Sequence, residues 1–261
     1  MHILRAMAIA FSMYSKIPVP QFAWKERDMR YTLCFFPWVG AVIGGIFALW
    51  NWLCGTFMVG NLCRVLIGGA IPIAVTGGFH LDGFLDTVDA LCSYGSREKK
   101  LEILKDSHVG AFAVIMTAMY GLIYLGALSE VTDGRLLKIV CGGFFLSRCL
   151  SGIGVVSFPK ARRDGTLRLF ADNAHRRAVK GALYLQSACC AGFMLLQSFW
   201  AVPVIMAAFL SFIYYRCRAE KEFGGITGDT AGFFVVICEG SMMAAAAAVS
   251  VLVAGGLVSI G

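Results

Sequence analysis

Charged residues are scarce in this sequence. Of its 261 residues, 15% are charged and 58% are hydrophobic, whereas a soluble domain carries about 25% charged residues. The mean hydropathy is +0.73. These values exclude an ordinary soluble domain and predict an integral membrane protein.

Several common motifs are also missing. No two of the 10 cysteines have the C-x-x-C spacing of a zinc or redox site, and most of them lie in apolar runs, where cysteine packs as a small hydrophobic residue. The first 20 residues end in Pro18-Val19-Pro20, and we expect no cleaved signal peptide. Because no stretch alternates aromatic and basic residues as nucleic-acid surfaces do, we expect no nucleic-acid partner.

Long apolar runs, in contrast, fill most of the chain. A helix needs about 20 mostly apolar residues to cross a bilayer, so residues 3–14 are too few and are expected to form a re-entrant or interfacial helix. The run at 202–215 is short, and its helix is expected to be tilted or longer than the apolar part. The sequence thus predicts an all-α polytopic membrane protein with about seven transmembrane helices, forming a single domain over residues 1–261. The predicted spans cover residues 32–58, 62–79, 109–128, 137–157, 181–199, 202–215 and 231–258.

Basic residues are distributed unevenly between the predicted loops. Lys and Arg accumulate in the cytoplasmic loops of membrane proteins. Leaving out Arg5 in the run at 3–14, the segment before the first span and every second loop after it share one side and hold 18 Lys and Arg residues, whereas the opposite side holds 3. This asymmetry supports seven spans and places the long polar loops, with any activity, on the cytoplasmic face. The strongly basic loop at 158–180 is expected to attract anionic lipid and phosphate-bearing substrates.

Three aspartates follow the second predicted span within eight residues, in the stretch HLDGFLDTVDAL. On a helix, Asp82, Asp86 and Asp89 would lie within about 60° of one another, because each residue advances by roughly 100°. No Lys or Arg is interleaved, and like charges at this spacing repel, so a bound cation explains the stripe better than a solvated surface does. Carboxylate oxygens suit Mg²⁺, which commonly also binds substrate phosphates. The stripe therefore predicts a Mg²⁺ site for a phosphate-bearing substrate, with a proton or cation path as the alternative.

Two further polar stretches lie on the predicted cytoplasmic face. In KDSHVG, Asp106 or Ser107 could cap the following span or act on substrate, and Lys105 adds a positive charge for phosphate. In GGITGD, the glycines permit close backbone approach, while Thr227 and Asp229 supply oxygens. The alternative for this second stretch is a glycine-rich turn in which Asp229 caps the last span.

Two charged residues, Arg148 and Glu239, fall inside predicted spans. Charges at membrane depth usually face the interior of the helix bundle or a polar cavity. Arg148 is therefore expected either to pair with Glu239 for structure or to bind a substrate phosphate.

The motifs together resemble the cobalamin synthase family, the adenosylcobinamide-GDP ribazoletransferases. The resemblance rests on TGGFHLDGFLDTVDAL, ILKDSHVGAF and GGITGD, in this order, and on FSMYSKIPVP near the N-terminus. Two positions depart from the family pattern, since Ala90 is commonly Gly and Val236 stands where an acidic residue is common. The basic loop at 158–180 also matches poorly.

The resemblance implies a Mg²⁺-dependent transferase of the cell (inner) membrane that joins adenosylcobinamide-GDP to α-ribazole or α-ribazole 5′-phosphate and releases GMP. A homo-oligomer, or association with other enzymes of cobalamin synthesis, is a further expectation, beside the contact with the lipid bilayer. Metal binding is assigned to Asp82, Asp86 and Asp89, and catalysis to the same three residues and Asp106. Substrate binding is assigned to His80, Lys105, Ser107, Arg148, Gly224, Gly225, Thr227, Gly228, Asp229 and Glu239.

Two other classes of protein compete with this interpretation. A cation-coupled transporter would place its aspartate ion site near the bilayer midplane and carry inverted repeats, whereas no internal repeat is evident here. A CDP-alcohol-type phosphotransferase would perform similar chemistry, but its D-x-x-D-G-x-x-A-R pattern is absent.

Overall fold

The computed structural model describes residues 2–20, 24–106, 108–162 and 166–256. Over these residues the regular structure is helical, apart from one isolated backbone bridge between Lys160 and Ile226. The helices are α1 (His2–Tyr14), α2 (Glu26–Met29), α3 (Thr32–Thr56), α4 (Asn61–Thr76), α5 (Phe79–Cys92), α6 (Arg97–Ile103), α7 (Ala111–Glu130), α8 (Gly134–Ser157), α9 (Thr166–Asn173), α10 (Arg176–Gln197), α11 (Ala201–Phe223) and α12 (Gly228–Ala254).

Six of these helices are long and apolar enough to cross a membrane, namely α3, α7, α8, α10, α11 and α12. The pair α4 and α5 passes the same test jointly and brings the number to seven if it counts as one span. The predicted all-α polytopic fold with about seven spans is confirmed. The helix at 202–215 is longer than its apolar part, as one of the two alternatives expected.

The predicted span over 62–79 is wrong in shape. Its helix ends at Thr76, and α5 then leaves at an angle of 93° to α4. Gly77 and Gly78 make this turn with φ values of 65° and 82°, a region that glycine enters without steric cost. The aspartate-bearing stretch therefore belongs to a separate helix, which packs against α12 and α7.

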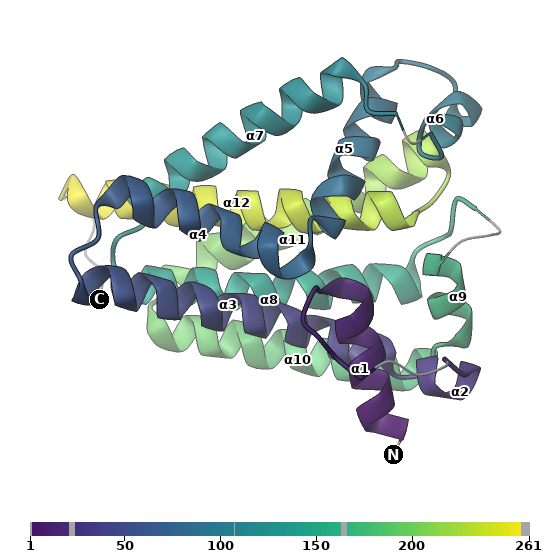
Figure 1. Cartoon of the computed structure of the whole chain (residues 1–261), viewed down its shortest axis with the longest axis horizontal. Helices are drawn as coiled ribbons and strands as arrows, with labels where there is room; N and C mark the ends of the chain where they lie inside the picture. Colours follow the sequence, from purple (N-terminus) through teal and green to yellow (C-terminus); the bar gives the residue numbers. More distant parts are fainter. Residues whose placement is uncertain (1, 21–23, 107, 163–165, 257–261) are drawn as a thin grey trace.

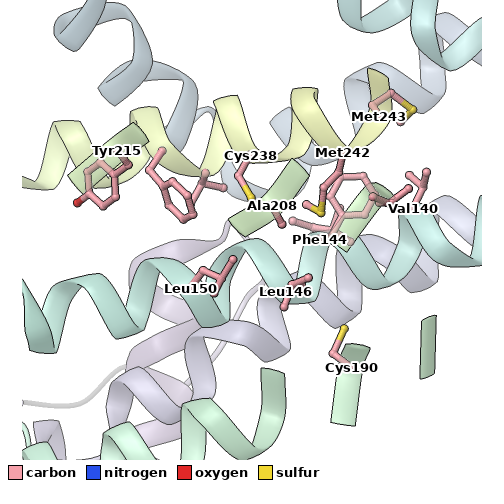
Figure 2. Packing of buried hydrophobic residues seen from close by; sticks show 14 of the residues in the cluster. Val140, Phe144, Leu146, Leu150, Cys190, Ala208, Tyr215, Cys238, Met242 and Met243 are labelled. Atoms are coloured by element: carbon pink, nitrogen blue, oxygen red, sulfur yellow. The ribbon is translucent and has the colours of Figure 1, made fainter. Parts of the chain in front are cut away.

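The long helices lie side by side around α8, most of which is buried. In Figure 1, α3, α8, α10 and α12 run nearly parallel, and α7 crosses them obliquely. Apolar side chains from several helices pack closely at this centre, as is typical of protein interiors. Figure 2 shows α8 packing against α10, α11 and α12. The labelled side chains at this contact are Val140, Phe144, Leu146, Leu150, Cys190, Ala208, Tyr215, Cys238, Met242 and Met243.

The short polar helices gather at one end of the bundle. Figure 1 places α2, α6 and α9 at the same end, where α3, α7, α10 and α12 begin. This is the arrangement that the uneven distribution of Lys and Arg predicts for loops on one side of a membrane. That this side is the cytoplasm stays a prediction.

The N-terminal helix α1 has 13 residues and is too short to cross a bilayer by itself. It packs against α3, where Ala6, Ile9 and Ala10 are buried and the ring of Tyr14 lies 4.2 Å from that of Phe36. Whether it is re-entrant or interfacial stays a prediction.

Candidate active site

A polar cavity of about 290 Å³ lies between α5, the start of α12 and the segment that follows α8. We call it the polar cavity. Its walls carry both negative and positive side chains, and aromatic rings from α1 and α3 close it on one side. The polar residues of its wall are His80, Asp82, Ser151, Lys160, Arg162, Thr227 and Asp229.

Helix α5 packs on α12 through its apolar face. Phe84 and Val88 are buried, and the ring of Phe84 stacks on Phe233 of α12 at 5.6 Å. A Cβ atom on Gly83 would lie 2.7 Å from the carbonyl oxygen of Asp229, so the backbones of the two helices are in close contact here. This contact brings Asp82 and Asp229, which are far apart in the sequence, into one cavity wall.

The three aspartates of α5 do not have equal positions. In the described part of the chain, the wall of the polar cavity includes Asp82 but neither Asp86 nor Asp89. The charge of Asp86 is close enough to those of Asp82, Asp89 and Asp229 for mutual repulsion. Asp89 instead faces the segment before α7, since a Cβ on Gly110 would lie 2.0 Å from its Oδ1 atom.

The residues present permit a metal ion that shares its ligands with a substrate. Among the described residues, no three His, Cys, Asp or Glu side chains converge into a group that could hold a metal. Mg²⁺ needs no such group, because it usually binds one or two carboxylates and completes its shell with water and phosphate oxygens. Asp82 and Asp229 suit this role, since both line the polar cavity and their charges interact. A joint site of Asp82, Asp86 and Asp89 stays a prediction.

The glycine-rich stretch before α12 forms a turn between α11 and α12. Gly224 ends α11 with φ of 76°, and Gly225 follows with φ of 153°. Thr227 is the N-cap of α12 and forms a capping box with Thr230. The predicted cap at Asp229 is therefore wrong, because Thr227 already accepts the N–H of Thr230, at 3.1 Å. Asp229 is left in the first helical turn, at the wall of the polar cavity.

A pair of backbone hydrogen bonds ties this turn to the segment after α8. The N–H of Ile226 donates to the carbonyl of Pro159 at 2.8 Å, and the N–H of Ala161 donates to the carbonyl of Ile226 at 3.0 Å. A Cβ on Gly225 would lie 2.6 Å from the carbonyl oxygen of Pro159, so this approach requires glycine. The bridge fixes the neighbouring cations beside the carboxylates of α5 and α12.

These cations, Lys160 and Arg162, are site residues that the sequence did not single out. Their signal was the general basicity of the loop at 158–180. Burial lowers the pKa of Lys160 to about 8, and the nearby charge of Arg176 adds to the effect. Arg162 donates to the carbonyl of Leu101 at 2.8 Å, and its charge attracts that of Asp229. The polar cavity thus offers cations for phosphate oxygens on one wall and carboxylates on another.

The KDSHVG stretch lies outside the polar cavity. Lys105 and Asp106 are exposed between α6 and α7, and Ser107 lies outside the described residues. Asp106 accepts the backbone N–H of His108 at 3.0 Å, which holds the pKa of this carboxyl below its ordinary value. Gly110 occupies the N-cap position of α7, so the predicted cap at Asp106 is wrong. The roles of Lys105 and Asp106 toward substrate stay predictions.

Comparison with known proteins places the chain in a family. A sequence model of the cobalamin-5-phosphate synthase family matches residues 6–247. The chain belongs to this family. No solved structure matches the chain.

Several curated relatives of this member of the cobalamin-5-phosphate synthase family are named adenosylcobinamide-GDP ribazoletransferase. One from Lachnoclostridium phytofermentans is 44% identical over 243 residues, covering 90% of each chain. Another from Herpetosiphon aurantiacus is 33% identical and covers 94% of this chain and 97% of its own. A third from Listeria monocytogenes is 31% identical, with 88% and 92% covered.

Two predicted site residues of this cobalamin-5-phosphate synthase family member lie deeper in the bundle. Arg148 of α8 forms an ion pair with Glu239 of α12, and Arg148 also donates to the carbonyl of Phe144 at 2.8 Å. The predicted pair is confirmed. Both residues line a second cavity and not the polar cavity, so substrate binding by either depends on what that second cavity holds.

Proposed function

We propose that this chain is an adenosylcobinamide-GDP ribazoletransferase. It joins adenosylcobinamide-GDP to α-ribazole, or to α-ribazole 5′-phosphate, and releases GMP. The names of the relatives support the substrates, and one observation supports the place of reaction. This observation is the polar cavity, where Asp82 and Asp229 face Lys160 and Arg162.

The reaction exchanges one phosphorus–oxygen bond for another. A ribose hydroxyl of α-ribazole attacks the phosphorus nearest the cobinamide arm and forms a new bond to it. The bond from this phosphorus to the bridging oxygen breaks, and the oxygen leaves with its electron pair as part of GMP. The hydroxyl proton passes to a carboxylate, for which Asp82 and Asp229 are the candidates in the cavity wall.

The cations orient the diphosphate for this displacement. Lys160 and Arg162 attract its oxygens, because charge-assisted hydrogen bonds to phosphate are the stronger ones. Both cations act from one wall, so the diphosphate lies with its reacting phosphorus toward α5. Holding the reactants in this way supplies much of the catalysis in phosphoryl transfer, where positioning and electrostatics dominate.

We include Mg²⁺ in this proposal, held by the one of Asp82 and Asp229 that does not take the proton, together with substrate phosphates. When bound, the ion neutralises charge that develops on the phosphate oxygens. Removal of divalent cations with a chelator is expected to stop GMP release, and added Mg²⁺ to restore it.

The same proposal places the active site on the cytoplasmic side of the cell membrane. The polar cavity lies near the end where α2, α6 and α9 gather (Figure 1), and basic loops favour the cytoplasm. Water-soluble nucleotide substrates then reach the cavity without crossing the bilayer.

The deciding experiment replaces one carboxylate and follows GMP. Purified protein in detergent receives adenosylcobinamide-GDP, α-ribazole and Mg²⁺. Asp82→Asn is expected to lower the rate of GMP release by about 10²-fold or more, the range for lost acid–base or charge stabilisation. Glu102→Gln removes an exposed carboxylate at the same end of the molecule and is the matched control with unchanged rate.

Two results would contradict the proposal in different ways. Near-normal GMP release by well-folded Asp82→Asn would remove this carboxylate from the reaction. Wild-type protein that releases no GMP but carries cations across a vesicle membrane would instead be a transporter.

A further inference from the structure

A second cavity, of about 350 Å³, lies between α4, α5, α7, α8 and α12, and the exposed side chains of Leu66 and Ile73 border it. We call it the inner cavity. Most of the side chains that line it are apolar, as Pro72, Ile73, Leu125 and Val236 illustrate. Small-molecule sites in proteins have volumes of about 300 to 1,000 Å³ and mostly apolar walls with a few polar groups. The size and lining of the inner cavity fall in this class.

The inner cavity also carries buried polar atoms without a partner. The hydroxyl oxygens of Thr117 and Tyr124 are buried and make no hydrogen bond in the described part of the chain, and the same holds for Nε of Arg148. All three residues line the inner cavity. Buried polar atoms nearly always have a partner in native proteins. Three unpartnered donors around an apolar space therefore indicate an apolar occupant that carries a hydrogen-bond acceptor.

His80 connects the inner cavity to the polar cavity. It lines both, it is only 5% exposed, and neither of its ring nitrogens has a hydrogen-bond partner among the described residues. The next residues along α5 lead to Asp82 at the polar cavity. One ligand could therefore place an apolar part in the inner cavity, pass His80 and reach the carboxylates.

We propose that the inner cavity binds the planar heteroaromatic base of α-ribazole, with its ribose beside His80 and its reacting hydroxyl in the polar cavity. This inference rests on the proposed function. The base is a benzimidazole-type ring in which one nitrogen bears the sugar and the other is an acceptor only. That nitrogen has one lone pair and can accept a hydrogen bond from one of the donors at Thr117, Tyr124 and Arg148, whereas a lipid acyl chain would leave them all unpartnered.

Two glycines of α7 provide a matched pair of variants. Gly121 lines the inner cavity, whereas Gly126 is on the same helix outside it. A Cβ atom at either position would meet nothing within 4 Å, so a larger side chain is accommodated at both. Gly121→Leu fills the inner cavity, and Gly126→Leu adds the same bulk elsewhere.

The experiment measures α-ribazole in two ways, by calorimetric binding to the purified protein and by its KM in the GMP-release assay. Gly121→Leu is expected to weaken α-ribazole binding and to raise its KM by about tenfold or more, a loss of about 1.4 kcal/mol. The KM for adenosylcobinamide-GDP is expected to stay unchanged, and Gly126→Leu to change neither. Equal KM values for α-ribazole in wild type and Gly121→Leu, or the same loss in Gly126→Leu, would overturn the inference.

A smaller change covers the case in which Gly121→Leu does not fold. Tyr124→Phe removes only the unpartnered hydroxyl and is expected to weaken α-ribazole binding severalfold, while Tyr184→Phe, at an exposed tyrosine of α10, has no effect. Unchanged binding in Tyr124→Phe would then overturn the inference. If wild-type protein releases no GMP, the proposed function fails. Calorimetry with α-ribazole alone still tests whether the inner cavity binds this ligand.

Discussion

At the scale of single residues, the charge of Lys160 depends on its surroundings. Burial and the neighbouring Arg176 lower its pKa to about 8, which is near the working pH of many enzymes. Its Nζ atom donates to the carbonyl of Phe158, so the amino group is held in place at the wall of the polar cavity. A cation in this position loses its attraction for phosphate when it loses its proton.

We expect the affinity for adenosylcobinamide-GDP to fall as the pH rises through about 8. The sign follows from the pKa, since Lys160 is charged below this value and neutral above it. Lys160→Arg keeps its charge throughout, so its KM is expected to change less between pH 7 and 9 than that of the wild type. The measurement is the KM for this substrate at each pH.

Lys138→Arg provides the control for this comparison. Lys138 is an exposed residue near the start of α8, at the other end of the molecule, and its variant should follow the wild-type profile. Parallel pH profiles for the wild type and Lys160→Arg would exclude Lys160 as the cause.

Part of the site could be predicted from residue types and spacing. Asp82 and Asp229 stand out because carboxylates are rare in so apolar a chain, and Thr227 because it lies beside Asp229 in a glycine-rich stretch. Lys160 and Arg162 do not, because the sequence holds them among many basic residues of one loop. Their selection depends on a backbone bridge to Ile226, a contact between distant segments that no local pattern records.

At the scale of helices, the ion pair of Arg148 and Glu239 links α8 to α12. Arg148 is completely buried, and it also contacts Ser147 and the carbonyl of Phe144. A buried charge that loses its partner is left without compensation, which costs about 3 to 5 kcal/mol. Replacing both charges with apolar side chains removes that cost.

We therefore expect Arg148→Met and Glu239→Met each to destabilise the protein by about 3 to 5 kcal/mol. The double variant should be destabilised by less than either single variant. Unfolding of the purified protein in detergent, followed by the loss of helical circular dichroism, measures the difference. Additive losses in the double variant would show that the two charges do not compensate each other.

The lengths of the apolar runs predicted the positions of most helices, but they did not predict the change of direction between α4 and α5. The predicted spans match α3, α7, α8 and α10 within a few residues, because the length of an apolar run reports the thickness of the bilayer. Hydropathy does not report the direction of the backbone, so α4 and the turn after it were joined into one span. The local signal was present in Gly77 and Gly78, which allow positive φ values.

At the scale of the whole molecule, the proposed orientation can be tested with two matched cysteines. Met58 and Tyr94 are 90% and 91% exposed, and each has a φ of 52°. Met58 lies between α3 and α4, and Tyr94 lies between α5 and α6, so the two positions are at opposite ends of the pair α4 and α5. The proposed orientation places them on opposite sides of the membrane.

In a background with Ser at the exposed Cys63, Cys189 and Cys217, a membrane-impermeant thiol reagent is added to intact cells. Met58→Cys is expected to react from outside, and Tyr94→Cys only after the membrane is opened, because basic loops remain in the cytoplasm. The reverse pattern would place the polar cavity on the outer face. Equal labelling of both in intact cells would contradict the number of spans.

The bridge between Lys160 and Ile226 has an evolutionary consequence. Its two hydrogen bonds join main-chain atoms alone, and the one side-chain requirement on its path is the glycine at position 225. Mutations in the loop after α8 can therefore accumulate without moving the backbone that carries the cations. A loop whose side chains vary can in this way keep Lys160 and Arg162 at the wall of the polar cavity, provided that the glycine at position 225 is retained.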